Sequence, residues 1–301
     1  MKRKIMALGK TCLAVSLPTK WHTKHSLKKG NELEIEEQEG RLILKTTAPK
    51  EPLKTTINLK SYSNKTIEKA LSALYKSGFD EITVLLDDLS KVLVVETIVK
   101  ELFFGFTITD QNKSGCTIKS IAQDDSKELQ NLIRRVFLIN LSLAENSLAF
   151  AKSTDYNNLQ NLIPLEKTVN QLTNFCQRII IKGLQEKKPF FSHVIVWNLE
   201  KVADEYKYLC QYLSTKKQAL SPGVLAYWKQ SNTYLRNYYE FFFSYSLDKC
   251  QELETAKSLL RKTSDHLLPK TPKEEIFVVN CLLNVNRITT DFITSTIALN
   301  Q

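Results

Sequence analysis

The sequence predicts an α+β protein with three parts: a small β-rich head, a mixed α/β segment and a long helical region. Three observations predict this class. Apolar and polar residues alternate between glycine turns over the first 45 residues, strand and helix patterns alternate over the next seventy or so, and the periodicity is then helical almost to the end. We place the domains at residues 1–48, 53–122 and 124–301.

The head contains four short strand candidates and one short helix. Gly9 lies between two short β runs, and its freedom at positive φ suits a tight turn. Pro18 suits the start of a helix, which we expect over residues 19–25. Leu33 and Ile35 alternate with glutamates between two glycine turns, as in a strand. About fifty residues bury too little apolar surface to be stable alone, so we expect this head to dimerise.

These residues form a pattern with a known counterpart. It consists of residues 3–8, Gly9-Lys10-Thr11, Ala14-Val15-Ser16-Leu17-Pro18, Trp21, Leu27-Lys28-Lys29-Gly30-Asn31, Leu33-Glu34-Ile35, Gly40 and Leu42-Ile43-Leu44. The pattern resembles the AbrB/MazE swapped-hairpin family. The resemblance implies a β-barrel made of interleaved hairpins from two chains, and a DNA-binding function.

The positive charge is concentrated in the head. Residues 1–30 carry eight basic side chains and no acidic one, and residues 1–60 carry a balance of +7 out of the chain's +10. A concentrated basic surface neutralises nucleic-acid phosphates, whereas a solvated basic tail is the alternative. The strand alternation argues against that tail. The side chains that we expect to contact DNA are Arg3, Lys4, Lys10, Thr11, Lys20 and Lys24.

Composition limits the remaining classes. No apolar stretch reaches the length of a membrane span, and Lys10 interrupts the apolar region that a signal peptide would need. We therefore expect no membrane insertion and a cytoplasmic location. The six cysteines are widely spaced with no C-x-x-C pair, which indicates reduced thiols and neither a zinc site nor a disulfide framework.

The second segment has the order β-α-β-α-β-β. The expected elements are strands at 57–59 and 81–86, helices at 65–76 and 89–103, and strands at 106–109 and 116–121, joined by a hairpin turn at 112–115. This alternation predicts a small ferredoxin-like α/β domain with its helices on one face. We find no phosphate-binding glycine loop in it. A spacer or dimerisation role is favoured over a regulatory small-molecule site.

The third segment predicts an antiparallel helical bundle. Helices are expected at 124–152, 156–184, 191–213, 223–246, 248–263 and 273–299, with prolines and polar residues at the breaks. A dense aromatic run at 234–245 is expected to lie mostly in the core, with any excess forming a partner surface. On the third helix, Glu200 and Asp204 are four residues apart and share one face. Two such carboxylates repel each other unless a cation or a basic partner offsets them.

This E-x-x-x-D helix, in a six-helix region behind an AbrB-like head, resembles the PhoU family. The whole chain is similar to the AbrB-PhoU fusions known as archaeal phosphate uptake regulators. The resemblance implies a bundle of two three-helix halves whose acidic helix motifs bind iron, zinc or a similar metal; magnesium also suits oxygen ligands. Glu200 and Asp204 match one motif, and Glu166 with Asn170 matches another with Asn in place of Asp.

The second half of the bundle departs from that pattern. Asn286 and Thr290 lie where the final helix would repeat the motif, so the resemblance does not extend metal binding to that half. An exposed acidic face with Lys201 and Arg287 as ordinary ion-pair partners is the alternative interpretation of these helices.

Two functions compete. The first is a dimeric transcriptional regulator of phosphate uptake, whose head binds DNA and whose bundle senses phosphate status. The second is a PhoU-like adaptor that regulates a phosphate transporter or its sensor kinase by protein contact. An antitoxin is less favoured, because some 250 folded residues replace the short toxin-binding tail. An enzyme is not expected, since no nucleophile, base and orienting group occur together and the four histidines lack suitable neighbours.

Overall fold

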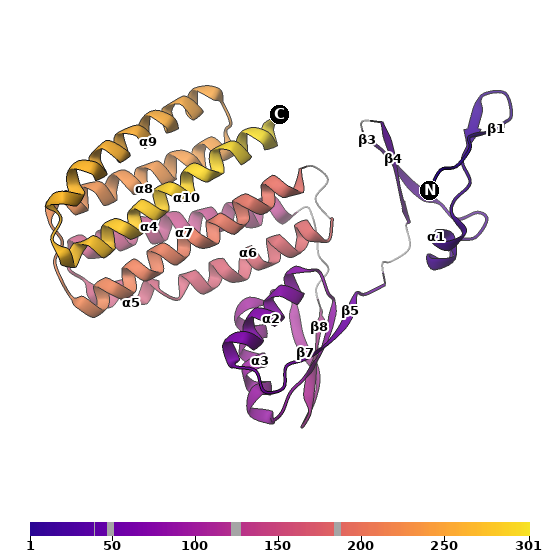
Figure 1. The fold of residues 1–301 in the computed structure, drawn as a ribbon, viewed down its shortest axis with the longest axis horizontal. Helices are drawn as coiled ribbons and strands as arrows, with labels where there is room; N and C mark the ends of the chain where they lie inside the picture. The colour runs from indigo at the N-terminus through magenta and orange to yellow at the C-terminus, as the bar shows by residue number, and fades with distance from the viewer. Residues whose placement is uncertain (39, 47–50, 122–127, 184–187) are drawn as a thin grey trace. The chain divides into compact units, whose positions relative to one another are not determined.

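The chain folds as an α+β protein of two compact units. The computed structural model describes residues 1–38, 40–46, 51–121, 128–183 and 188–301 (Figure 1). The units comprise Met1–Pro52 and Leu53–Gln301, so the expected second and third segments lie in one unit. The boundaries predicted at 48, 122 and 124 lie outside the described residues.

The first unit has the four strands and the short helix predicted for the head. Strands β1 (Met6–Leu8) and β2 (Cys12–Ala14) form one antiparallel hairpin, and β3 (Leu33–Gln38) and β4 (Arg41–Thr46) form another. Helix α1 (Thr19–Lys24) begins directly after Pro18. Gly9 has a φ of +81°, which confirms the predicted tight turn between β1 and β2.

The α/β part of the second unit has the predicted element order. It consists of β5 (Lys54–Asn58), α2 (Asn64–Lys76), β6 (Glu81–Leu85), α3 (Leu89–Leu102), β7 (Phe106–Asn112) and β8 (Gly115–Ser120). The strands form one sheet in the order β5-β6-β8-β7, with β5 and β6 parallel and the other neighbours antiparallel.

This topology corrects the ferredoxin-like prediction. In a ferredoxin-like sheet another strand separates the two parallel strands of each βαβ unit, whereas β5 and β6 here pair directly. The strands with the most buried side chains, β6 and β8, are central, and the more polar β5 and β7 are the edges. The β7–β8 hairpin therefore joins the sheet through its more apolar strand.

The remaining helices run side by side in Figure 1. They are α4 (Leu129–Lys152), α5 (Tyr156–Leu162), α6 (Leu165–Ile181), α7 (Pro189–Lys216), α8 (Pro222–Phe243), α9 (Leu247–Leu267) and α10 (Ile276–Asn300), with short 3₁₀ turns before α10. The single helix predicted at 156–184 is wrong, because Pro164 lacks a backbone donor and the chain restarts as α6 directly after it. The start predicted at 124–127 and the end at 184 lie outside the described residues.

The aromatic run of α8 lies largely in the core, as the sequence predicts. Tyr234, Tyr238 and Phe241 are buried, and the other aromatic residues of the run pack partly buried against them. Phe137 of α4 contacts Tyr238 and three further rings of this run at centroid distances of 5.2–5.9 Å. This aromatic cluster joins α4 to α8.

Helix α6 joins the bundle to the α/β domain through a fully buried arginine. The Arg178 guanidinium donates to the carbonyl oxygens of Tyr75 (3.1 Å) and Phe79 (2.7 Å) and to the Asp80 carboxylate. It also lies over the rings of Tyr75 and Phe106, at 5.3 and 4.8 Å from their centroids. Since a buried charge is stable only when it is paired and hydrogen-bonded, this arrangement fixes α6 against the domain.

The last helical segment is long enough and apolar enough, by length and composition alone, to match a membrane-spanning helix. Among the described residues, Lys273–Asn300 is the one such segment, and half of its most apolar window is buried within the protein.

Replacing Arg178 is expected to destabilise the second unit. Arg178→Met leaves two carbonyl groups without their buried donor and removes one of the two cationic partners of Asp80, at a cost of about 3 kcal/mol. Urea denaturation followed by circular dichroism measures the change. Arg135→Met, at an exposed position on α4, is the matched control and should cost less than about 0.5 kcal/mol. Equal stability of the two variants would contradict this role of Arg178.

Asp80 should also make the stability of this unit sensitive to acid. Burial raises the pKa of Asp80, but hydrogen bonds from Lys182 and from the Leu53 backbone, together with the positive charges of Lys182 and Arg178, lower this pKa by more. A carboxyl whose folded pKa is lowered stabilises the fold above its ordinary value of 3.8, and this contribution is lost as pH falls through the folded value. Asp80→Asn should therefore be less stable at pH 7 and lose less stability than the wild type below about pH 4. An unchanged acid dependence would contradict this assignment.

Candidate nucleic-acid interface and acidic helix faces

The six residues expected to contact DNA are all exposed on the first unit. Arg3 and Lys4 precede β1, Lys10 and Thr11 lie in the β1–β2 turn, and Lys20 and Lys24 lie on α1. Within the described part of the chain, none of the eight basic side chains of residues 1–30 has an ion-pair partner. Their charges are therefore available to an external polyanion.

The same unit leaves its apolar side chains uncovered. No described residue of 1–52 is buried, and the large exposed ones are Ile5, Met6, Leu8, Leu13, Val15, Ile35, Leu42 and Leu44. Leu13 is 71% exposed although it lies in a strand. Isolated two-stranded hairpins are marginally stable in water, so these side chains need a covering surface.

The structure brings together three of the four residues proposed as metal ligands. Lys207 of α7 donates from Nζ to Glu166 of α6 at 2.8 Å and to Asp204 at 2.7 Å. Asn170 donates from Nδ2 to the same Glu166 oxygen at 2.6 Å. Glu200 does not contact Lys207 but is linked to Asp204 through Lys201, whose Nζ is 3.5 Å from each carboxylate.

The two lysines remain charged in this setting. Burial lowers the pKa of Lys207, but hydrogen bonds to Asp204 and Glu166 and their negative charges raise it by more, so the net pKa lies above the ordinary value. The pKa of Lys201 is raised in the same way by Glu200 and Asp204. The carboxylates therefore already have cationic partners within the protein.

This donor set fits an ion-pair network and does not fit a metal ion. A metal that used Glu166 and Asp204 together would have to displace the Lys207 ammonium group from both. The described residues contain no cluster of three or more His, Cys, Asp or Glu side chains suited to a metal. We derive no metal chemistry from these helices.

Sequence reasoning identified the acidic residues and Lys201 but missed Lys207. Lys207 is three residues after Asp204 and seven after Glu200, so the helical repeat places all three on one face. The spacing of Lys207 from Asp204 and Glu200 was the sequence signal that could have identified this ion pair. The contact with Glu166 spans 41 positions and depends on how α6 packs against α7.

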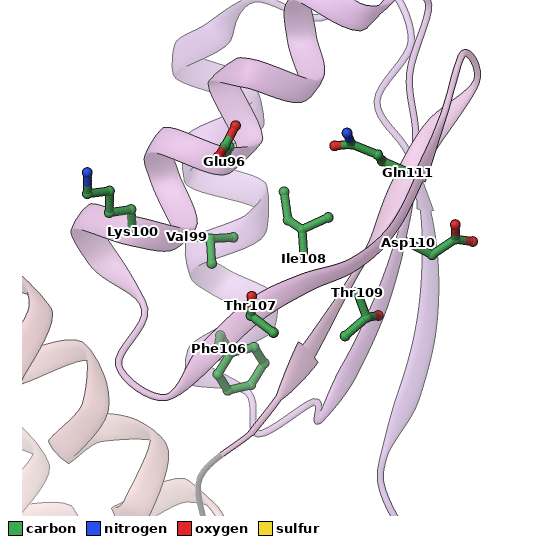
Figure 2. Close-up of a pocket in the computed structure, with 9 residues that line it drawn as sticks. All are labelled: Glu96, Val99, Lys100, Phe106, Thr107, Ile108, Thr109, Asp110 and Gln111. Atoms are coloured by element: carbon green, nitrogen blue, oxygen red, sulfur yellow. The ribbon is translucent and has the colours of Figure 1, made fainter.

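A groove lies between α3 and the edge strand β7, with a volume of about 570 Å³. Figure 2 shows Val99 of α3 and Ile108 of β7 facing this space, whereas Asp110 points away from it. The described residues that line it include no buried polar side chain without a hydrogen-bond partner. We assign no ligand to this groove.

The buried cysteines are unsuited to nucleophilic chemistry. Burial raises the pKa of Cys116 to about 11 and the pKa values of Cys176, Cys210 and Cys281 to about 12. Their thiols stay protonated at neutral pH, and the thiolate is the reactive form.

No protein-family model, curated protein or solved structure matches this chain.

The ion pairs of Lys207 should contribute measurably to stability. Lys207→Gln leaves Glu166, which is buried, without its cation, and we expect a loss of roughly 2 kcal/mol. Thermal and urea unfolding measure the effect. Lys201→Gln on the same helix is the matched control, and its longer, more exposed contacts predict a loss below about 0.5 kcal/mol.

Zinc titration of both variants separates the two interpretations of this cluster. If Glu166 and Asp204 formed a metal site, removing the competing Lys207 ammonium group would raise zinc affinity without loss of stability. That outcome would contradict the ion-pair interpretation.

Proposed function

We propose that this protein is a dimeric DNA-binding transcriptional regulator whose first unit contacts DNA. One observation carries the proposal: exposed apolar side chains and basic side chains without ion-pair partners occur together in the first unit. A second copy would cover the apolar residues. The same association would double the number of lysines and arginines available to DNA phosphates.

The charge distribution supports DNA over other acidic partners. Residues 1–30 carry eight basic and no acidic side chains, and a short helix and a hairpin turn both present some of them. Lysines dominate, and lysine holds phosphates more readily than it reads base edges. We therefore propose that these residues position the protein on the duplex.

The regulated process is proposed from the resemblance to AbrB-PhoU fusions. In this proposal the two hairpins form an interleaved barrel with those of a second chain, and the helices of the second unit form a PhoU-like sensor of phosphate status. The proposed location is cytoplasmic, where both DNA and the phosphate signal are accessible. Metal binding at Glu166, Asn170, Glu200 and Asp204 is not part of the proposal. Lys207 already pairs with Glu166 and Asp204, Lys201 pairs with Glu200 and Asp204, and Asn170 donates to Glu166.

A specific surface favours the adaptor as the second candidate. Phe190, Val194 and Trp197 recur at helical spacing on α7 and are 83%, 39% and 50% exposed. Such an apolar stripe is suited to a protein partner, for example a transporter or kinase subunit. In that case the first unit would serve for dimerisation alone.

DNA binding by the first unit should depend on its lysines. Lys10→Ala/Lys20→Ala removes two charges per chain, so we expect at least tenfold weaker binding at physiological salt. The slope of log affinity against log salt should fall by roughly 0.9 for each lost phosphate contact. Fluorescence anisotropy of the full-length protein with duplex from its own upstream region measures both, with an unrelated duplex as competitor.

The matched control for this experiment is Lys65→Ala/Lys69→Ala, which removes two exposed charges from α2 in the other unit. The control should bind as the wild type does. Wild-type binding that is equal for both duplexes and disappears at physiological salt would contradict the regulator and favour the adaptor. Identical loss in both variants would show a general charge effect and remove Lys10 and Lys20 from the interface.

A further inference from the structure

A cavity of about 490 Å³ lies among α8, α9 and α10. This volume is within the range of roughly 300–1,000 Å³ that is typical of small-molecule sites. Helices α9 and α10 both pack against α8 and make few contacts with each other, so α8 forms the floor of the cavity. The lining residues are Tyr227, Tyr234, Lys257, Leu260, Arg261, Ser264, Asp265, Leu268, Leu283, Asn286, Arg287, Thr290 and Asp291.

The facing sides of α9 and α10 carry polar side chains among apolar ones at the cavity. Lys257, Arg261 and Ser264 recur at three- and four-residue spacing on α9, as do Asn286 and Thr290 on α10. Leu260, Leu268 and Leu283 complete the lining of the cavity. A cavity that combines apolar side chains with a few polar groups is typical of a small-molecule site.

Two arginines at the cavity have no ionic partner. Among the described residues, neither Arg261 nor Arg287 makes an ion pair, although Asp265 and Asp291 follow them by four positions. Lys257 also lines the cavity, and its Nζ lies 3.1 Å from Glu254. The lining therefore carries three cations and two carboxylates, and both guanidinium groups are available to an anion.

Neutral hydroxyl groups lie beneath these charges. The Tyr234 hydroxyl is 3.1 Å from the Thr290 hydroxyl, and the Tyr227 hydroxyl accepts from Asn286 Nδ2 at 3.0 Å. Burial raises the pKa of Tyr234 to about 12 and also raises that of Tyr227. Both phenols stay protonated at neutral pH and are able to donate to an anion.

Asn286 supplies a polar group whose hydrogen bonding is incomplete. It is 9% exposed, and its Nδ2 donates to Tyr227 and to Ser231 at 3.0 Å each. Its Oδ1 is buried and has no hydrogen-bond partner within the described part of the chain. This amide oxygen is not accessible from the cavity, so Asn286 contributes by holding the Tyr227 and Ser231 hydroxyl groups in place through its Nδ2.

We propose that this cavity binds a small phosphate monoester that also carries hydroxyl groups, such as a sugar or nucleoside monophosphate. The phosphate dianion offers three acceptor oxygens to Arg261, Arg287 and Lys257, more than one carboxylate provides. The ligand's hydroxyl groups donate to the rim carboxylates Asp265 and Asp291. This site does not depend on whether the first unit binds DNA.

Isothermal titration calorimetry of the full-length protein tests the proposal with AMP and ribose 5-phosphate. Inorganic phosphate, citrate and ribose are the comparison probes. We expect binding of at least one ester, at least tenfold tighter than binding of inorganic phosphate or citrate, and none of ribose. Arg261→Gln/Arg287→Gln should weaken ester binding at least tenfold. Both arginines are exposed, so this variant should keep the wild-type melting temperature without ligand.

The matched control is Lys262→Gln/Lys270→Gln, which removes two exposed charges outside the cavity from α9 and the turn after it. It should bind the esters as the wild type does. The proposal is overturned if neither ester binds, if citrate or inorganic phosphate binds as tightly as the esters, or if both double variants weaken binding equally.

Discussion

The buried Arg178 guanidinium is the interaction that makes the α/β domain and the helical bundle one body. It satisfies the carbonyl groups at the end of α2, pairs with Asp80 at the start of β6 and lies against two aromatic rings. Lys182, one turn further along α6, pairs with the same carboxylate at 2.7 Å. Because a guanidinium group has many donors in a fixed plane, this side chain constrains both the position and the orientation of α6, together with the contacts of Gln171 and Asn174 with the end of α3.

The two units satisfy their polar and apolar groups in different ways. The second unit has an extensive buried core, and its acidic helix faces are neutralised internally by Lys207 and Lys201. The first unit has no buried residue among those described, and within the described part of the chain the eight basic side chains of residues 1–30 make no ion pair. The second unit thus pairs these charges and buries its core within one chain, whereas we propose that the first unit covers its apolar side chains with a second copy and offers its charges to DNA.

The local sequence pattern predicted the helices and strands, whereas contacts between distant residues determine how these elements pack. Alternation and helical periodicity identified every strand of the α/β sheet and most helix ends, because these depend on neighbouring residues. The strand order depends on pairings such as Lys54 with Glu81 and Glu81 with Lys119, and the partners of Arg178 lie about a hundred positions away, so no local pattern encodes either. The acidic pair Glu200 and Asp204 was recognised correctly as needing a cation, but the cation in the structure is a lysine.

The proposed dimer depends most on the exposed apolar side chains that the first unit has as a single chain. Sedimentation velocity of the intact wild-type protein at micromolar concentration tests this directly, with Leu13→Asp/Leu42→Asp as the comparison. Both leucines are exposed in the single chain, so their replacement should not disturb a monomer. We expect the wild type to sediment at twice the chain mass of 34.6 kDa and the variant as a monomer. A wild type that is monomeric, or a dimer that is unaffected by the substitutions, would contradict the account.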